Sequence, residues 1–418
     1  MKGRCTITIK YVIYFHLLVI CFIVQVNTCV GQTTFDSLKQ NSNLDSSFQP
    51  SKMPTIKTEF ANIKISGIIQ PAFYYDNNNV FNNDLFVTSE IPTTKITDIK
   101  FRRTHLSANQ SRLGFGFTFP TAKIETSALL QGDFFSSPKD EHSYFRLRHA
   151  YIKFGEFTVG KTWTNFGDVN GAPNTLDLEG PNSMPASRIA QVRWDHKLKN
   201  NLNLVLAIEE PKSDYTPLEG APNLEAALPE IVVKTSKRYS FGRWVNSIVY
   251  KPIIYTDKEY SFKKHLFGWG ATSSFTYNLK DGSKLNPFKI KKRTISVFGI
   301  IGSGTQGSVN DFGGLGYEAF PTDSVTLKTL LYYGGYVSFS FVWNKRWSST
   351  FVYSYLHLEK PRTTNNIFEL SSYFAANGIY AINKFFTVGG EVLYGAKKNY
   401  DDTKGSAFRI LGLLRLMF

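Results

Sequence analysis

The last stretch of the chain, Ser406-Ala-Phe-Arg-Ile-Leu-Gly-Leu-Leu-Arg-Leu-Met-Phe418, decides the fold class. Every second residue from Phe408 to Phe418 is apolar or glycine, whereas the intervening set carries Arg409 and Arg415. A β-strand points successive side chains to opposite faces, so this segment has one oily face and one face with two guanidinium groups. A soluble sandwich can show such alternation, but it does not normally end on a strand of membrane-crossing length. The stretch therefore predicts a transmembrane β-strand.

The same two-residue period repeats upstream. In residues 112–119, one Leu and three Phe alternate with Arg, Gly and Thr, and residues 332–343 show the same pattern. Trp343 and Trp347 flank a short polar turn, as interfacial aromatic residues of a membrane barrel do. No run of 18 apolar residues follows the first thirty residues, which excludes a helical membrane protein, although the chain is 15% aromatic. We predict an all-β, transmembrane, antiparallel up-and-down barrel.

The alternating segments number about sixteen, an even count as bacterial barrels require, with 14 or 18 left open. Short turns alternate with longer polar loops between them, and residues 280–292 are an exception because this expected turn is long and lysine-rich. One short turn is expected at Lys237–Tyr239. The predicted strands are 63–75, 102–119, 122–135, 144–155, 156–166, 188–197, 201–210, 229–236, 242–255, 264–279, 293–304, 328–343, 347–358, 367–381, 385–396 and 406–418.

Residues 1–31 have the features of a secretory signal peptide. Lys2, Arg4 and Lys10 precede an apolar run from 11 to 26, and Cys29 and Gly31 are small residues before a cleavage site at Gln32. A retained membrane anchor, or lipidation at Cys29, is an alternative. Residues 32–62 are polar without a sustained period and predict a flexible periplasmic segment, with a short helix or plug as the alternative. Residues 63–418 would form the barrel.

Cysteine usage and charge narrow the function. All three cysteines lie in the leader, so the mature chain has no disulfide, thiolate metal site or cysteine nucleophile. Removing the three basic residues of the leader from the formal charge of +15 leaves +12. An exported chain rarely meets nucleic acid, so a positive interior that attracts anions is the better interpretation.

The loop from Gly167 to Ser187 is a candidate constriction. It carries Asp168, Asp177 and Glu179 among glycines and prolines. A bore enclosed by about sixteen strands is water-filled and needs narrowing if it is to discriminate between solutes. We expect this loop to fold inward, and an ordinary external loop is the alternative.

Arginines on the inward phase of the strands supply a basic wall. By alternation with apolar neighbours, Arg112, Arg146, Arg148 and Arg193 face the lumen, and Arg102 joins them if strand 102–119 has no bulge. Fixed cations raise the local concentration of anions, and guanidinium matches the geometry of carboxylate. The alternative is that these arginines pair with acids such as Asp133 and stiffen the wall.

Enzymatic interpretations find little support. The histidines outside the leader lack metal-ligand spacing such as HExxH, and no GxSxG motif occurs. The glycine-rich pieces at 302–304 and 313–316 lack the Lys-Ser/Thr of a phosphate-binding loop, so they are interpreted as loop residues. We expect no catalytic activity, no metal and no cofactor.

An ordered set of motifs resembles the DcaP-like porins of Gram-negative outer membranes, over residues 100–195. The terminal strand agrees, and its aromatic end resembles the signal that barrel-assembly machinery reads. Departures are Lys161, where the family pattern has Gln, and a segment 32–62 without the helical heptads of some relatives. The motifs are Ser111-Arg-Leu-Gly-Phe115, Gln131-Gly-Asp-Phe-Phe135, Arg146-Leu-Arg-His-Ala-Tyr151, Gly160-Lys-Thr-Trp-Thr-Asn-Phe-Gly-Asp168, Gly180-Pro181, Arg188 and Gln191-Val-Arg-Trp194.

The resemblance implies a homotrimer of sixteen-stranded barrels in the outer membrane, in contact with its lipid and lipopolysaccharide. It implies passage of small anionic solutes, dicarboxylates included. It places the four inward-phase arginines along the channel, and Asp133 and Asp168 near its narrowing. Two other functions remain open: a slow channel selective for hydrophobic or sugar nutrients, and a structural or adhesive barrel that does not conduct.

Overall fold

The computed structural model describes residues 55–77, 80, 82–93, 102–120, 122–135, 143–211, 214–215, 223–225, 228–256, 263–279, 292–322, 326–362 and 366–418. The expected leader, most of the expected periplasmic segment and nearly all of the turn 280–292 lie outside these ranges. In the described ranges, no helix has the length and hydropathy needed to cross a membrane. A three-residue strand, β1 (Thr55–Lys57), occurs where an irregular segment was expected, and it pairs with the first strand of the wall.

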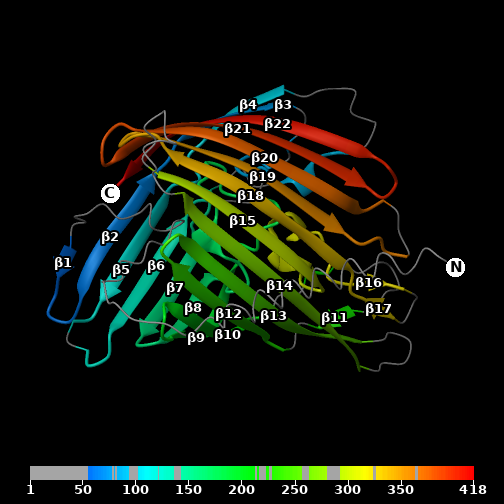
Figure 1. Cartoon of the computed structure of the whole chain (residues 1–418), viewed down its shortest axis with the longest axis horizontal. Coiled ribbons are helices and arrows are strands. Elements are labelled where there is room, and N and C mark those ends of the chain that lie inside the picture. The colour runs from blue at the N-terminus through cyan, green and yellow to red at the C-terminus, as the bar shows by residue number, and fades with distance from the viewer. Residues whose placement is uncertain are drawn as a thin grey trace.

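The described strands form one closed antiparallel wall with sixteen positions, so the predicted barrel is confirmed (Figure 1). Each position of the wall pairs with the next one along the chain, with β2 beside β5 and β3 beside β4, and β22 pairs with both β2 and β3 to close the ring. The wall consists of β2 (Asn62–Ile69) with β3 (Ala72–Asn77), β4 (Arg102–Ser107) with β5 (Arg112–Thr118), β6 (Thr126–Asp133), β7 (Arg146–Phe154), β8 (Phe157–Trp163), β9 (Arg188–Lys197), β10 (Leu202–Glu209), β12 (Glu230–Tyr239), β13 (Gly242–Thr256), β14 (Lys263–Leu279), β15 (Lys292–Ser303), β18 (Leu331–Val342), β19 (Trp347–Leu358), β20 (Phe368–Ala381), β21 (Phe386–Asn399) and β22 (Lys404–Met417).

The two faces of β22 differ as its sequence predicts. Ile410 and Leu414 are each 42% exposed on the outside, whereas Arg409 and Leu411 are 1% exposed on the inside. A strand in a membrane barrel turns its apolar side chains to lipid, which removes the cost of exposing them to water. The oily face is therefore the outer face.

The first two strands of the wall are each interrupted, although the sequence predicted continuous strands. Pro71 follows Gln70 between β2 and β3; proline has no N–H for the ladder, so the strand is interrupted there. The neighbouring position is interrupted between β4 and β5, where the Ser111 N–H donates to the Ala108 carbonyl in a turn. The two breaks lie side by side because β3 pairs with β4 and β2 pairs with β5.

Tight turns join strands at one end of the barrel. Between β7 and β8 the turn consists of Gly155 and Glu156, and Gly155 has φ of 54°, a left-handed conformation that glycine adopts without strain. The predicted turn at Lys237–Tyr239 is wrong, because β12 continues through Tyr239 and its ladder with β13 extends to the Tyr239–Gly242 pair.

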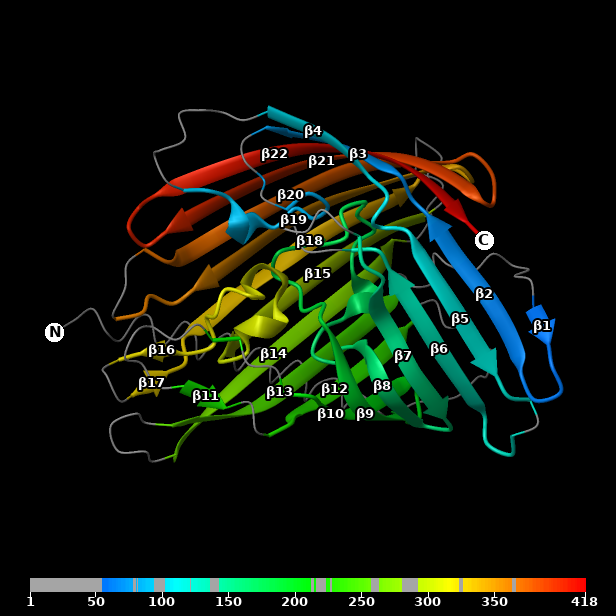
Figure 2. The ribbon, with the colours of Figure 1, turned by 180° about the vertical axis from the view of Figure 1, so that it is seen from behind.

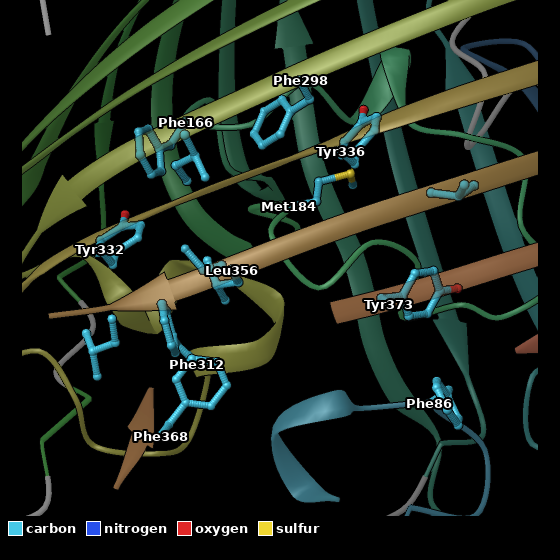
Figure 3. Close-up of a cluster of buried hydrophobic side chains, with 14 of the residues drawn as sticks. Phe86, Phe166, Met184, Phe298, Phe312, Tyr332, Tyr336, Leu356, Phe368 and Tyr373 are labelled. Carbon is cyan, nitrogen blue, oxygen red and sulfur yellow. The ribbon is translucent and has the colours of Figure 1, made fainter. Parts of the chain in front are cut away.

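Three segments between strands fold into the barrel and bury an apolar core against its inner wall (Figures 2 and 3). They lie at 80–93, 164–187 and 304–322, and they include the short helices η2 (Thr88–Glu90), η3 (Val169–Gly171), η4 (Gln306–Ser308) and η5 (Asn310–Phe312). Figure 3 shows Phe86, Phe166 and Phe312 from these segments beside Tyr332 and Tyr373 from the wall. The inner face is therefore partly apolar where segments pack on it, and polar elsewhere.

Candidate functional site

The predicted constriction loop is anchored at its base by an ion pair. Asp168 is 2% exposed and lies 2.8 Å from Nη2 of Arg243 on β13, and Oγ of Ser274 on β14 donates to it at 2.7 Å. Burial opposes ionisation, but the positive charges of Arg243 and Lys234 hold the pKa of Asp168 below its usual range. Lys234 also donates to the carbonyl of Gly167 at 2.6 Å. The base of the loop is thus fixed to β12, β13 and β14.

The tip of the same loop reaches the opposite wall. The backbone N–H groups of Leu176 and Asp177 donate to the carboxylate of Glu391 on β21 at 2.9 and 2.7 Å. Nδ2 of Asn182 donates to Oγ of Ser371 on β20 at 2.7 Å. The loop therefore crosses the interior from β8 to β20 and β21, as a constriction loop must.

Asp177 ties this loop to the segment 80–93. Its carboxylate accepts hydrogen bonds from the N–H of Phe86 at 3.2 Å and from the hydroxyl of Tyr373 at 3.1 Å. Burial raises the pKa of Asp177 to about 6, although Arg409 and the hydrogen bonds oppose the rise. A carboxyl group with this pKa changes its charge within the range of pH that a cell surface meets.

A group of acids gathers where the three inward segments meet. Burial, followed by the charges of Asp177, Asp311 and Glu90, raises the pKa of Glu179 well above its usual range. Asp311 of η5 accepts from the hydroxyl of Thr88 at 2.6 Å, which joins the segments 80–93 and 304–322. Asp177 and Glu179, which the sequence singled out, thus lie with acids from two other segments, a grouping that no sequence spacing indicated.

The adjacent strands β5, β6 and β7 carry a basic cluster, in which arginine side chains lie around Asp133. Asp133 is fully buried; Arg146 holds it through Nε at 3.0 Å and Nη2 at 2.9 Å, and Arg148 through Nη1 at 2.6 Å. Arg112 is in register with Asp133 on the adjacent strand. A register shift between Gln131 and Gly132 accompanies the inward placement of both β7 arginines. Arg146 and Arg148 both contact this carboxylate, and the side chain of Arg146 is 47% exposed.

Arg193 lies on the inner face of β9 but is not part of this cluster. Its Nε donates to the carboxylate of Asp195 at 2.8 Å, and Nη1 donates to Oδ1 of Asn165 at 3.4 Å. Asn165 begins the constriction loop and also donates to Glu209. Arg193 therefore helps to hold the start of the loop.

The inward placement expected for Arg102 is wrong. Arg102 is exposed on the phase of β4 that it shares with Leu106, whose exposure of 78% marks the outer face. The expectation required an unbroken strand, and the turn at 108–111 changes the phase between Arg102 and Arg112. Arg103 faces inward instead, with Nη2 at 3.2 Å from Asp76.

Asp76 belongs to a second cluster that the sequence did not reveal. Arg409 of β22 holds it through Nε at 2.6 Å and through Nη2 at 3.0 Å, and both residues are 1% exposed. The alternation of β22 indicated that Arg409 faces inward. Its partner could not be found by spacing, because 333 residues separate the two.

Within the described ranges, no group of three or more His, Cys, Asp or Glu side chains could hold a metal ion. The described interior has the features of a passage lined by charged side chains. A loop docked across the bore carries acids, and one wall carries arginines that contact Asp133. Such a passage sorts solutes by size and charge.

The sequence model of the DcaP outer membrane protein family matches residues 24–290, more than half of the chain. The chain belongs to the DcaP outer membrane protein family. This DcaP-family protein is accordingly an outer-membrane β-barrel and a porin-like channel. No curated protein sequence matches it.

Solved structures support the fold of this DcaP-family barrel. The outer membrane channel DcaP of Acinetobacter baumannii superposes with a TM-score of 0.73 at 18% identity, over 87% of this chain and 99% of that one. An anion-selective porin from Comamonas acidovorans gives 0.54 at 10% identity, over 86% and 100%. OmpT of Vibrio cholerae gives 0.51 at 10% identity, over 87% and 99%.

Proposed function

We propose that this DcaP-family barrel is a passive diffusion channel that favours small anions, dicarboxylates included. The observation that carries the proposal is the cluster in which Arg146 and Arg148 contact Asp133, because it places two guanidinium groups on the wall of the bore and leaves the side chain of Arg146 47% exposed. Fixed positive charge in a confined passage raises the local concentration of anions. The similarly folded porin from Comamonas acidovorans is described as anion-selective, which agrees with the proposal.

The acidic residues of the inward segments oppose this preference for anions. Glu179, Asp177 and Asp311 lie inside the barrel, and burial raises the pKa of each, although the charge of Arg146 opposes the rise at Glu179. Acids with raised pKa values carry less negative charge than exposed acids at the same pH, so they repel anions less. The basic wall then dominates the selectivity.

Bilayer recording tests the proposal. The purified protein, inserted in a planar bilayer between unequal KCl solutions, should give stepwise currents whose reversal potential has the sign for chloride over potassium. A reversal potential favouring potassium would overturn the anion preference. A folded barrel that gives no current would instead support a structural or adhesive role.

A channel selective for particular nutrients is the second candidate. Three segments pack an apolar core inside the barrel, which favours a narrower route than an open bore. Saturation of the current by a sugar or hydrophobic solute, without saturation by carboxylates, would favour this candidate.

We further propose a homotrimer whose contact is the wall from β5 to β8. β5 and β8 have seven residues each, whereas β13 has 15 and β14 has 17. Seven residues rise ~18 Å along the barrel axis at the usual tilt, less than the ~25 Å apolar band of an outer membrane. A neighbouring subunit can cover this part of the barrel, where the strands are short, better than lipid can. The trimeric form known for OmpT of Vibrio cholerae agrees.

The export of the chain is part of the same proposal. A signal peptide cleaved after Gly31 would deliver residues 32–418 to the periplasm, and the terminal strand would direct assembly into the membrane. The mass and N-terminal sequence of protein isolated from outer membranes test this cleavage, and chemical cross-linking in membranes tests the trimer. A mature chain that begins at Met1, or a cross-linked species no larger than one chain, would contradict the respective part.

A further inference from the structure

Arg415 is an inward-facing residue that forms no ion pair with a carboxylate of the described residues. It occupies the inner phase of β22, three residues before the chain ends, and it is half-buried. Its Nε donates to Oε1 of Gln70 at 2.6 Å. Among the described residues, its Nη1 and Nη2 atoms have no hydrogen-bond partner, and neither atom is fully buried.

The other inward arginines whose contacts are resolved all have acidic partners. In each of these pairs a guanidinium nitrogen lies between 2.6 and 3.2 Å from a carboxylate oxygen. They are Arg103 and Arg409 with Asp76, Arg146 and Arg148 with Asp133, Arg193 with Asp195, and Arg243 with Asp168. A partly desolvated charge without a counter-charge is costly, so Arg415 attracts a mobile anion more strongly than an arginine that already contacts a carboxylate does.

A chain of amides fixes the direction of Arg415. Nε2 of Gln70 donates to Oε1 of Gln110, and Nε2 of Gln110 donates to the hydroxyl of Tyr74 at 3.0 Å and to the carbonyl of Asp84 at 3.2 Å. Because each amide nitrogen is engaged in turn, the oxygen of Gln70 must point at Arg415. Gln70 and Gln110 are 2% and 1% exposed, which holds both in place.

The two adjacent strand breaks explain why these amides are hydrogen-bonded in series. Gln70 lies at the break between β2 and β3, and its N–H, freed from the ladder, donates to Oγ of Ser111 at 3.1 Å. Gln110 lies at the adjacent break between β4 and β5. The two strand breaks lose hydrogen bonds of the ladder, and they place the side-chain amides of Gln70 and Gln110 side by side, next to Arg415.

Arg415 lies next to the docking point of the constriction loop. Leu176, at the tip of that loop, packs with Leu411 and Leu413 of β22 and lies against Gly389. Arg415 is the next inward residue of β22 after Leu413, toward the end of the chain. A solute that passes the loop tip along this wall meets Arg415 next. Asp84 forms no ion pair with Arg415, and one of its carboxylate oxygens accepts from Asn109 at 2.9 Å.

We infer that Arg415 is a carboxylate-binding station on the C-terminal side of the constriction, oriented by Gln70 and Gln110. With Nε engaged, Nη1 and Nη2 present an end-on pair of donors that matches the two oxygens of a carboxylate. The inference rests on the proposed anion channel and adds a second binding point to the cluster around Asp133. Gln70 and Gln110 are positioning residues.

The test measures how succinate, added to either chamber, reduces the KCl current through single channels. Arg415→Gln should raise the apparent dissociation constant for succinate roughly tenfold, because a charge-assisted pair of hydrogen bonds is lost. Arg415→Lys keeps the charge but loses the paired donors, so it should raise the constant severalfold. Arg346→Gln is the matched control: Arg346 is exposed at the turn after β18, and its Nη1 donates to the hydroxyl of Tyr380.

The outcomes separate this inference from the proposed function. A wild-type channel that does not conduct, or that prefers potassium, overturns the anion channel. An anion-preferring wild type in which Arg415→Gln binds succinate as before overturns the Arg415 station alone. If Arg415→Gln weakened the binding of chloride and of succinate equally, the assignment of Arg415 to carboxylate binding would be overturned.

A folding control keeps the test decisive. Heat-modifiable migration on gels shows whether Arg415→Gln forms the barrel. If it does not, Gln70→Ala gives the second measurement, because it keeps the arginine and removes its orientation. A severalfold weaker response to succinate in Gln70→Ala supports the station, and an unchanged response overturns it.

Discussion

The ring of Phe418 lies over Gly67 where the last strand meets the first. A Cβ atom placed on Gly67 would lie 2.1 Å from Cζ of Phe418, so only glycine fits beneath the ring. The two backbones exchange hydrogen bonds of 2.9 and 3.1 Å, which extend the ladder between β2 and β22 to the end of the chain. An aromatic ring that covers a glycine on the neighbouring strand shields its backbone and fixes the register. The terminal residue therefore helps to close the barrel.

Gly67→Ala should weaken this closure. The added methyl must displace the ring of Phe418, and overpacking of this kind costs about 1–3 kcal/mol. We expect a lower unfolding midpoint in urea for the barrel reconstituted in lipid. The matched control is Gly412→Ala on the outer face of β22, where an added Cβ meets nothing within 4 Å. Equal stability of the two variants would show that the ring does not need the glycine.

Most strands of the wall could be predicted, because apolar and polar side chains alternate over the whole length of a membrane strand. β9 and β19 have the bounds that their sequences predicted, 188–197 and 347–358. The break at Pro71 was not predicted, because the apolar period of Ile65 and Ile69 continues through it to Phe73. The break at 108–111 was not predicted either, although the apolar phase changes there between Leu106 and Leu113. The error for Arg102 follows directly, since a turn of unknown length removes the phase relation between the residues on either side.

The site could be predicted only in part. Alternation placed Arg112, Arg146 and Arg148 on the inner face, and loop composition indicated that 167–187 folds inward. The partners of these residues depend on how the ring closes. Arg243 is 75 residues from Asp168, and no local pattern connects the two.

Arg243→Gln should loosen the base of the constriction loop. Asp168 would remain buried without its guanidinium, and breaking a buried ion pair of this kind costs about 3–5 kcal/mol. We expect lower stability in urea and larger current fluctuations in single-channel recordings, because the loop then moves in the bore. Arg238→Gln, an exposed arginine of the same hairpin, should leave both unchanged. Quiet currents in Arg243→Gln would show that the tip alone fixes the loop.

The docking of the loop tip should depend on pH through Asp177. Its pKa is raised from the ordinary value of 3.8 to about 6, so docking favours the protonated form. The stabilisation from protonation is complete below about pH 3.8, and it is lost as the pH rises through about 6. Glu391 and Tyr373 face Asp177 from the wall. We therefore expect steady, low conductance at acid pH, with more frequent openings above pH 6.

Asp177→Asn tests the assignment of this pH dependence. The amide cannot ionise, so the loop should stay docked at high pH and the rise in openings should disappear. Recording the same variant at low pH is the internal control, since there it should resemble the wild type. If the pH dependence persists unchanged in Asp177→Asn, another group is responsible.

Opposite substitutions in the basic cluster should move the ion selectivity in opposite directions. Asp133→Asn removes the negative charge of the carboxylate that Arg146 and Arg148 share, so the net charge of the cluster becomes more positive and the preference for chloride should rise. Arg146→Gln removes one of the two guanidiniums and should lower that preference, by about twofold in the permeability ratio. Reversal potentials in a KCl gradient measure both, with the exposed Arg346→Gln as the control. Shifts of the same sign in the two variants would mean that the cluster stiffens the wall without setting the field in the bore.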